Sequence, residues 1–238
     1  MEARKVISKL RSMANPRNVE GMARFGINTE NALGISVTSL RKYAKTIGTD
    51  HALALELWDS GIHEARILAA IVDDPSEVTE EQMEHWVRDF DSWDVCDQAC
   101  TSLFDRTPFA FSKAAEWSHR EEEFVKRAGF AMMAGLAAHH KSAPDEMFVV
   151  LLEHVKREST DDRKYVKKAV NWALRGIGKR NLHLNAMAIE AAAQISEIDS
   201  RPARWIASDA LRELSSEAVR KRLESRLPGA RPGRRPSS

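Results

Sequence analysis

The sequence is poor in the residues that build disulfide, zinc and redox sites. Its two cysteines, Cys96 and Cys100, are four residues apart, so the chain contains no C-x-x-C pair. We expect both to be buried thiols in a protein of a reducing compartment. His63-Glu64 lacks the second histidine of a metalloprotease helix, and no glycine-rich phosphate loop occurs. The sequence therefore implies neither a metal nor an organic cofactor.

Long apolar runs and strand patterns are also missing. No apolar run approaches the ~20 residues that a membrane span needs, and no signal-peptide pattern follows Met1. We therefore expect a monomeric, cytoplasmic protein that does not enter a membrane. No β-hairpin signal or alternating strand pattern appears either, so the sequence predicts an all-α fold.

Helix signals fill the chain instead. Thr79-Glu-Glu-Gln82 is a capping box, and Ser36 or Thr38 is the expected cap of the helix at 40–47. The predicted helices cover residues 6–13, 19–25, 40–47, 51–60, 63–72, 79–90, a segment from 93 that ends before 107, 110–117, 122–139, 144–156, 163–177, 184–195 and 202–214. We predict one domain over residues 1–226 and a disordered Pro/Gly/Arg-rich tail over 227–238.

The helices form pairs whose second members resemble one another. Arg66, Asp97, Arg127 and Lys168 fall at equivalent positions, at intervals of 31, 30 and 41 residues. Helix pairs at such intervals predict an α-solenoid of HEAT-like repeats, a single curved domain whose second helices line the concave face. On that face Asp97, Arg127 and Lys168 would form a row, with one tryptophan a turn before it and one a turn after it, Trp93 and Trp172.

A net charge of +1 conceals a strong separation of charge along the chain. Residues 73–97 carry ten acidic side chains and one basic one, whereas residues 154–183 carry nine Lys/Arg and three acidic residues. The basic stretch indicates either a phosphate-binding surface or a solvated helix face. The acidic stretch has no such interpretation, and a position on the convex surface is the simplest one.

Five motifs in this order resemble the AlkD-like DNA glycosylases, which are DNA alkylation repair proteins built from HEAT-like repeats. The resemblance extends from about residue 22 to residue 214. Its motifs are Gly34-Ile-Ser-Val-Thr-Ser-Leu-Arg41, His-Glu-x-Arg at 63–66, Trp-x-x-x-Asp at 93–97, Lys126-Arg-Ala128 and Lys168-Ala-Val-Asn-Trp-Ala-Leu-Arg175. Phe124 departs from the family pattern, which has a tryptophan before the Lys-Arg pair.

The resemblance implies excision of cationic N3- or N7-alkylpurines from double-stranded DNA, without moving the base into a pocket. It assigns Trp93, Trp172 and Asp97 to the sugar and phosphates of the lesion, and Arg127 to the backbone. Lys126 is the alternative to Arg127 at that position. The DNA-binding residues expected from the basic stretch and the motifs are Lys126, Lys164, Lys168, Arg175, Lys179 and Arg180.

The residue chemistry agrees with this assignment. A cationic purine leaves without a general acid, so an enzyme has to stabilise an oxocarbenium-like sugar and orient water. The carboxylate of Asp97 could do both, and electron-rich indoles favour cationic character nearby. Nothing singles out an amine nucleophile, which predicts a monofunctional enzyme.

Other interpretations stay open from the sequence alone. Asp97 could pair with Arg127 for structural reasons, and tryptophans at helical spacing are often part of a core. Four of them, Trp58, Trp86, Trp117 and Trp205, are predicted to lie between repeats. At the level of the whole chain, the alternatives to a glycosylase are a non-catalytic reader of damaged or structured DNA and a protein-interaction scaffold.

Overall fold

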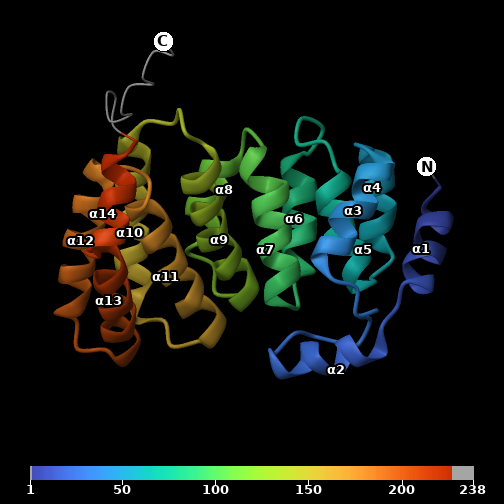
Figure 1. Ribbon diagram of the computed structural model, residues 1–238, viewed down its shortest axis with the longest axis horizontal. Helices are drawn as coiled ribbons and strands as arrows, with labels where there is room; N and C mark the ends of the chain where they lie inside the picture. The colour runs from blue at the N-terminus through green and yellow to red at the C-terminus, as the bar shows by residue number, and fades with distance from the viewer. Residues whose placement is uncertain (1, 227–238) are drawn as a thin grey trace, which may run out of the picture. The chain divides into compact units, whose positions relative to one another are not determined.

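The computed structural model describes residues 2–226, and every regular element in this part of the chain is helical (Figure 1). The all-α prediction is confirmed. The chain divides into two compact units, unit 1 over residues 1–132 and unit 2 over residues 133–238. The tail predicted for 227–238 lies outside the described residues, and the single domain over 1–226 stays a prediction. Within 2–226, no helix combines the length and the apolar character needed to cross a membrane.

Unit 1 begins with two short helices and continues as helix pairs. Helix α5 packs against α4, and it also contacts α3 and α7. In Figure 1, α2 lies apart from the helix pairs of this unit, and none of its residues is fully buried. The elements are α1 (Ala3–Ser12), α2 (Pro16–Arg24), α3 (Val37–Ile47), α4 (His51–Asp59), α5 (His63–Val72), α6 (Glu80–Arg88), α7 (Trp93–Ser102), the 3-10 turn η1 (Phe104–Arg106), α8 (Ala110–Trp117) and the first part of α9 (Glu123–His139).

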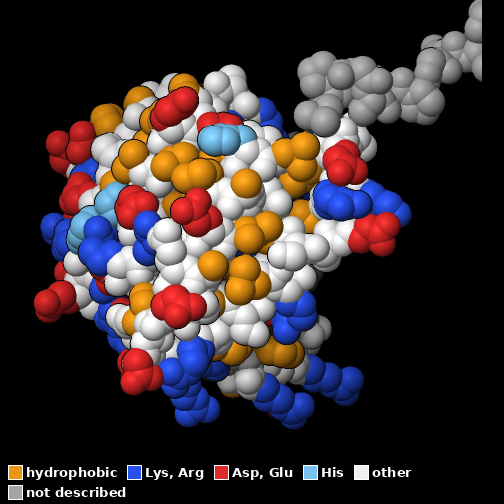
Figure 2. Space-filling model, turned by 90° about the vertical axis from the view of Figure 1, so that its left-hand side faces the viewer, with side chains coloured by type: hydrophobic (Ala, Val, Ile, Leu, Met, Phe, Trp, Pro, Cys, Tyr) orange, Lys and Arg blue, Asp and Glu red, His pale blue; other side chains and the backbone are white. Residues whose placement is uncertain are grey.

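Unit 2 holds the end of α9 and five further helices. Helix α12 packs against α10, α11 and α13, and α11 also contacts α13. Figure 2 looks onto the α12 side of this unit, where hydrophobic side chains are interspersed with charged ones. The elements are α10 (Asp145–Arg157), the 3-10 turn η2 (Glu158–Thr160), α11 (Lys164–Gly178), α12 (Leu182–Ser196), α13 (Arg201–Leu214) and α14 (Glu217–Glu224).

The predicted helices match these elements, with most ends shifted by a few residues. The side chain of Ser36, not that of Thr38, caps α3 by accepting the N–H of Ser39, and Thr79 caps α6 in the same way. Helix α14 was not predicted. Its sequence is largely polar, and only Leu223 is buried.

An aromatic core joins the first helices of the pairs in unit 1. The rings of Trp58 on α4 and Trp86 on α6 are stacked, with centroids 4.0 Å apart and planes 3° from parallel. The ring centroid of Phe104 lies 6.0 Å from that of Trp86 and 5.9 Å from that of Trp117 of α8. All four side chains are fully buried. Three of the four tryptophans assigned to the core are therefore confirmed there.

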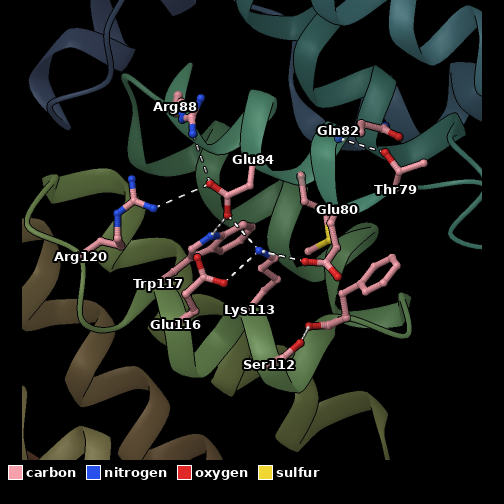
Figure 3. Close-up of polar contacts among 12 residues, drawn as sticks. Thr79, Glu80, Gln82, Glu84, Arg88, Ser112, Lys113, Glu116, Trp117 and Arg120 are labelled. Carbon is pink, nitrogen blue, oxygen red and sulfur yellow. Dashed lines mark hydrogen bonds and ion pairs between the residues drawn. The ribbon is translucent and has the colours of Figure 1, made fainter.

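The acidic stretch supplies internal contacts between successive helix pairs. Glu84 on α6 accepts the indole N–H of Trp117 at 2.7 Å and the amine of Lys113 at 3.2 Å (Figure 3). Burial lowers the pKa of Lys113, but three carboxylates, Glu116, Glu84 and Glu80, outweigh burial and raise its pKa. Asp89 likewise accepts the indole N–H of Trp58 at 2.9 Å. Several carboxylates of 73–97 therefore connect neighbouring helices, and the position of this stretch on the convex surface stays a prediction.

Close packing of α9 on α8 in unit 1 gives a first prediction. A Cβ added to Gly129 would lie 2.5 Å from the backbone nitrogen of Ser118 and 2.9 Å from the carbonyl oxygen of Ala114. Both are backbone atoms that cannot rotate away, so we expect Gly129→Ala to lower the free energy of unfolding by about 1–3 kcal/mol. Urea unfolding followed by circular dichroism measures the change.

The matched control for this substitution is Gly21→Ala on α2. A Cβ at Gly21 meets nothing within 4 Å, and its helical position favours alanine over glycine by about 0.5–1 kcal/mol. We therefore expect an unchanged or slightly raised free energy of unfolding. An equal loss in both variants would contradict the steric explanation.

Candidate active site

The first two turns of α7 present an aromatic ring and a carboxylate on one face. Trp93 begins the helix, Asp97 follows one turn later, and both are partly exposed. The side chain of Asp97 is 15% exposed, so it is accessible over a small area. The adjoining side of α7, which also faces α9, holds Cys96 and Cys100, whose thiols lie 3.7 and 3.6 Å from carbonyl oxygens of α9. Both cysteines are buried and unbridged, as predicted.

Asp97 and Arg127 form a bidentate ion pair between α7 and α9. The Nε of Arg127 donates to Oδ1 of Asp97 at 2.9 Å, and its Nη2 donates to Oδ2 at 2.7 Å. The guanidinium also lies 6.0 Å from the ring centroid of Trp93. Burial raises the pKa of Asp97, although the charge and hydrogen bonds of Arg127 act to lower it. The arrangement fixes the orientation of the carboxylate.

Arg127 makes an internal contact, and its predicted contact with the DNA backbone stays a prediction. Its side chain is only 6% exposed, and two of its nitrogens hold Asp97. Within this unit its visible role is to position a carboxylate, and a DNA phosphate would have to reach another part of the guanidinium. Lys126, the alternative at this position, is partly exposed in the first turn of α9.

The segment after α2 is attached directly beside Trp93. The indole nitrogen of Trp93 donates to the carbonyl oxygen of Phe25 at 3.2 Å. Three residues on, the Nδ2 of Asn28 donates to Asp91 at 2.7 Å, and its backbone N–H donates to the hydroxyl of Ser92 at 3.3 Å. Phe25 is 71% exposed. These contacts place an exposed aromatic ring and the end of α2 next to the α7 site.

The His-Glu-x-Arg motif on α5 contacts both α7 and the segment that follows α2. Nε2 of His63 is 2.8 Å from Oδ2 of Asp94 on α7. Glu64 is fully buried and accepts three backbone N–H groups, those of Leu33 at 2.7 Å, Gly34 at 2.6 Å and Ile35 at 3.1 Å. His63 thus holds α7 in place, and Glu64 holds the segment between α2 and α3.

Arg66, the last residue of the motif, contacts residues of the aromatic core and the end of α6. Nη1 of Arg66 donates to the carbonyl oxygen of Asp89 at 3.1 Å, and its guanidinium lies 5.3 Å from the ring centroid of Trp58. The assignment of Arg66, Asp97 and Arg127 to one repeat position stays a prediction. The structure uses all three to connect adjacent helices.

The His63–Asp94 pair makes stability depend on pH. Burial lowers the pKa of His63, but the hydrogen bond and charge of Asp94 outweigh burial, so the pKa is raised above 6.5. The pair therefore contributes fully below about pH 6.5, and its contribution is lost as the pH rises through the folded-state pKa. The pKa of Asp94 is lowered, although burial acts to raise it, because His63 and Ser92 bond to the carboxylate. At acidic pH, the contribution of Asp94 to stability is lost as the pH falls from about 3.8 through the lowered pKa of its carboxyl group.

We expect the free energy of unfolding to fall more steeply above pH 6.5 in the natural sequence than in His63→Gln. Urea unfolding at intervals between about pH 5.5 and pH 8.5 measures the two curves. His183→Gln, on the exposed side of α12, is the control and should retain the slope of the natural sequence. Parallel curves for the natural sequence and His63→Gln would refute the assignment.

Arg41 ends one of the sequence motifs and lies near the site, although the sequence predicted no role for it. Arg41 on α3 is exposed, and its Nη2 donates to Oε1 of Gln98 at 3.0 Å. Gln98 follows Asp97 directly, so Arg41 lies on the same part of α7. An exposed arginine at the end of a motif was the available signal, but its contact 57 residues away could not be read from the sequence.

The predicted residues of unit 2 divide into two groups. Lys164 and Lys168 on α11 are exposed, and Trp172 is partly exposed one turn after Lys168. These three belong to unit 2, whereas Trp93, Asp97 and Arg127 belong to unit 1. The row of Asp97, Arg127 and Lys168 with Trp93 and Trp172 beside it stays a prediction.

The remaining predicted cations are engaged inside unit 2. Arg175 and Lys179 both bond to Glu213 of α13, at 2.6 and 2.8 Å. Arg180 is buried, donates to the carbonyl oxygens of Lys141 and Ala143 at 3.1 and 2.8 Å, and lies 4.1 Å from the ring centroid of Phe148. Arg180 therefore joins structural elements of the unit, and its burial does not favour the predicted contact with DNA.

Comparison with known proteins decides the family. Residues 6–214 match the model of a family described as DNA alkylation repair enzyme. The chain belongs to this family. Two relatives are uncharacterised proteins of Listeria innocua and Listeria monocytogenes, each 22% identical over 195 and 197 residues, which cover 80% of this chain and 85% of each relative.

A solved structure shows the fold. It is described as representing a new family of proteins related to the HEAT-like repeat DNA glycosylases with affinity for branched DNA structures. It matches with a TM-score of 0.79 at 20% identity, over 94% of this chain and 96% of that one. The prediction of HEAT-like helix pairs is thereby confirmed for this DNA alkylation repair family member.

Proposed function

We propose that this DNA alkylation repair family member is a monofunctional DNA glycosylase that removes cationic N3- or N7-alkylpurines from duplex DNA. The observation that carries the proposal is the accessible edge of Asp97, fixed by two hydrogen bonds from Arg127 beside the ring of Trp93. A carboxylate oriented before the substrate arrives does not have to reorganise when charge develops on the sugar.

The proposed reaction is a hydrolysis at C1′ of the damaged nucleotide. The bond between C1′ and the purine nitrogen breaks, and its electron pair neutralises the cationic base. Asp97 stabilises the positive charge that develops on the sugar and orients a water molecule, whose oxygen forms the new bond to C1′. The proton of that water passes to Asp97 or to solvent, leaving an abasic site and a neutral base.

Several side chains of unit 1 are suited to hold the DNA during this step. Trp93 offers an indole face that favours cationic character, worth about 0.5–2 kcal/mol. Exposed Arg41 and the exposed arginines of α2, Arg17 and Arg24, supply positive charge for phosphates in the same unit. In unit 2, the exposed Lys164 and Lys168 are proposed to contact phosphates as well.

The test is single-turnover release of 7-methylguanine from a duplex by the natural protein, corrected for spontaneous loss. Release well above the spontaneous rate supports the proposal. Salt-sensitive binding to the same duplex without release would overturn the catalytic assignment.

A second candidate is a non-catalytic protein that binds branched DNA. It is favoured by the described affinity of the structurally similar family for branched DNA structures. It predicts tighter binding to a four-way junction than to a duplex of equal length, with no abasic product from either. The same preparation can be tested for both activities.

A further inference from the structure

Trp205 on α13 is far more exposed than the sequence predicted. Its side chain was expected in the core between repeats, but the residue is 42% exposed. Trp58, Trp86 and Trp117 are fully buried, and Trp93 and Trp172 are intermediate. Part of the apolar surface of this indole is therefore available for contact with a ligand.

The position of Trp205 follows from the regular pairing of α11 with α13. Asn171 donates to Asp209 at 2.7 Å and Arg175 donates to Glu213 at 2.6 Å, and both pairs are 38 residues apart. The constant separation shows that the two helices run parallel. One turn earlier, Lys167 and Trp205 have the same separation, so they form the first contact of this series.

That first contact differs in chemistry from the other two. Asp209 and Glu213 receive their partners through hydrogen bonds, whereas the amine of Lys167 lies 5.4 Å from the ring centroid of Trp205. A cation held over one side of the indole, together with the exposure of the residue, leaves aromatic surface open to solvent.

Several positive charges lie near Trp205, together with the carboxylates of Asp162 and Asp199. Lys164 lies one turn before Lys167 and Arg201 one turn before Trp205, and both are exposed. Arg204 pairs with Asp199 at 2.8 Å, but both side chains are more than half exposed, so this pair contributes little and can open. The N-terminal turns of α11 and α13 therefore combine an open indole with several cations.

We propose that Trp205 is a stacking site for an unpaired base of DNA, and that Lys164 and Arg201 hold the flanking phosphates. This inference rests on the proposed DNA-binding function and specifies a substrate class for it. Aromatic side chains beside a basic surface bind single strands because every base has a flat face and every linkage a negative charge. Bases within an intact duplex are stacked on both faces, so the site selects DNA with gaps, bulges or branch points.

The experiment compares two fluorescein-labelled DNAs of equal length, one fully paired and one with a five-nucleotide thymidine gap. Fluorescence anisotropy at one fixed salt concentration gives Kd for each. We expect the natural protein to bind the gapped DNA about tenfold more tightly, since stacking on one aromatic residue contributes about that much per base. Trp205→Ala should reduce the preference to less than about twofold, with little change for paired DNA.

Three further variants separate stacking from charge and from folding. Trp205→Phe keeps an aromatic face and should retain most of the preference, whereas Trp205→Leu keeps apolar surface without one and should lose it. Lys168→Ala, which removes a neighbouring cation, should weaken binding to both DNAs by a similar factor. Circular dichroism of each variant shows whether the helical content is unchanged.

The outcomes are distinguishable. A gap preference that survives in Trp205→Ala, or one absent from the natural protein although it binds paired DNA, would overturn the stacking site and leave the proposed function intact. Failure of the natural protein to bind either DNA would overturn both. A second readout is 2-aminopurine placed in the gap, whose fluorescence should be quenched by the natural protein and not by Trp205→Leu.

Discussion

Asp97→Asn is expected to slow single-turnover release of 7-methylguanine by about 100-fold. The amide keeps the size of the side chain but loses the negative charge that stabilises the sugar cation. It also turns a donor toward one nitrogen of Arg127, since the bidentate contact needs two acceptors. The rate of release should therefore fall because the chemical step is slower, whereas the affinity for the duplex should persist.

The control for Asp97→Asn is Asp91→Asn, two residues before α7. Asp91 is an exposed carboxylate that bonds to Asn28, so the control removes the same charge from the same region. Both variants should bind duplex DNA as well as the natural protein or slightly better, because each removes a repulsive charge. Retention of the natural rate by Asp97→Asn would refute the catalytic role. An equal loss in Asp91→Asn would refute its specificity.

The pH dependence of release offers a further readout of the same group. Burial raises the pKa of Asp97, and the proposed role requires the ionised form. Release above the spontaneous background should accordingly decline as the pH falls through a value higher than 3.8, and Asp97→Asn should lack that decline.

Glu64→Gln is expected to lower the free energy of unfolding by about 3–5 kcal/mol. Three backbone N–H groups converge on the two oxygens of this buried carboxylate. An amide would place its own N–H₂ against at least one of these donors and leave it without an acceptor. The urea unfolding midpoint measures the loss.

The control is Glu56→Gln, which makes the same chemical change on the exposed side of α4 and should alter stability by less than about 0.5 kcal/mol. Glu64→Gln should also make residues 15–36 more sensitive to limited proteolysis, because the segment between α2 and α3 loses its attachment. Equal midpoints for Glu64→Gln and Glu56→Gln would show that these hydrogen bonds are not essential.

Local signals were sufficient to predict most helices, and their failures have physical causes. Ser36 and Thr79 cap helices with side chains that bond three residues ahead, an interaction visible in any window of the sequence. Helix α14 buries only Leu223 and so lacks the apolar periodicity that reveals a helix. Trp205 was misassigned because exposure depends on what the neighbouring helix places opposite it.

The candidate site was predictable to the extent that it follows the repeat. Asp97 and Arg127 are predicted at equivalent positions 30 residues apart, and the structure joins them directly. The contact of Glu64 was not predictable in this way, because its partners are backbone N–H groups about 30 residues earlier. Almost every residue type carries a backbone N–H, so the sequence does not show which ones donate to Glu64.

The joint role of Asp97 as accessible carboxylate and as internal partner of Arg127 restricts how this lineage can change. Replacing Asp97 alone by a residue with no acceptor oxygen would remove the proposed chemistry and also leave a nearly buried guanidinium with neither a counter-charge nor a hydrogen-bond acceptor, which is strongly destabilising. A descendant that abandons excision and retains only DNA binding therefore has two stable choices. It can keep the pair unchanged, or it can replace both residues together, so the two positions should vary as a unit across related genomes.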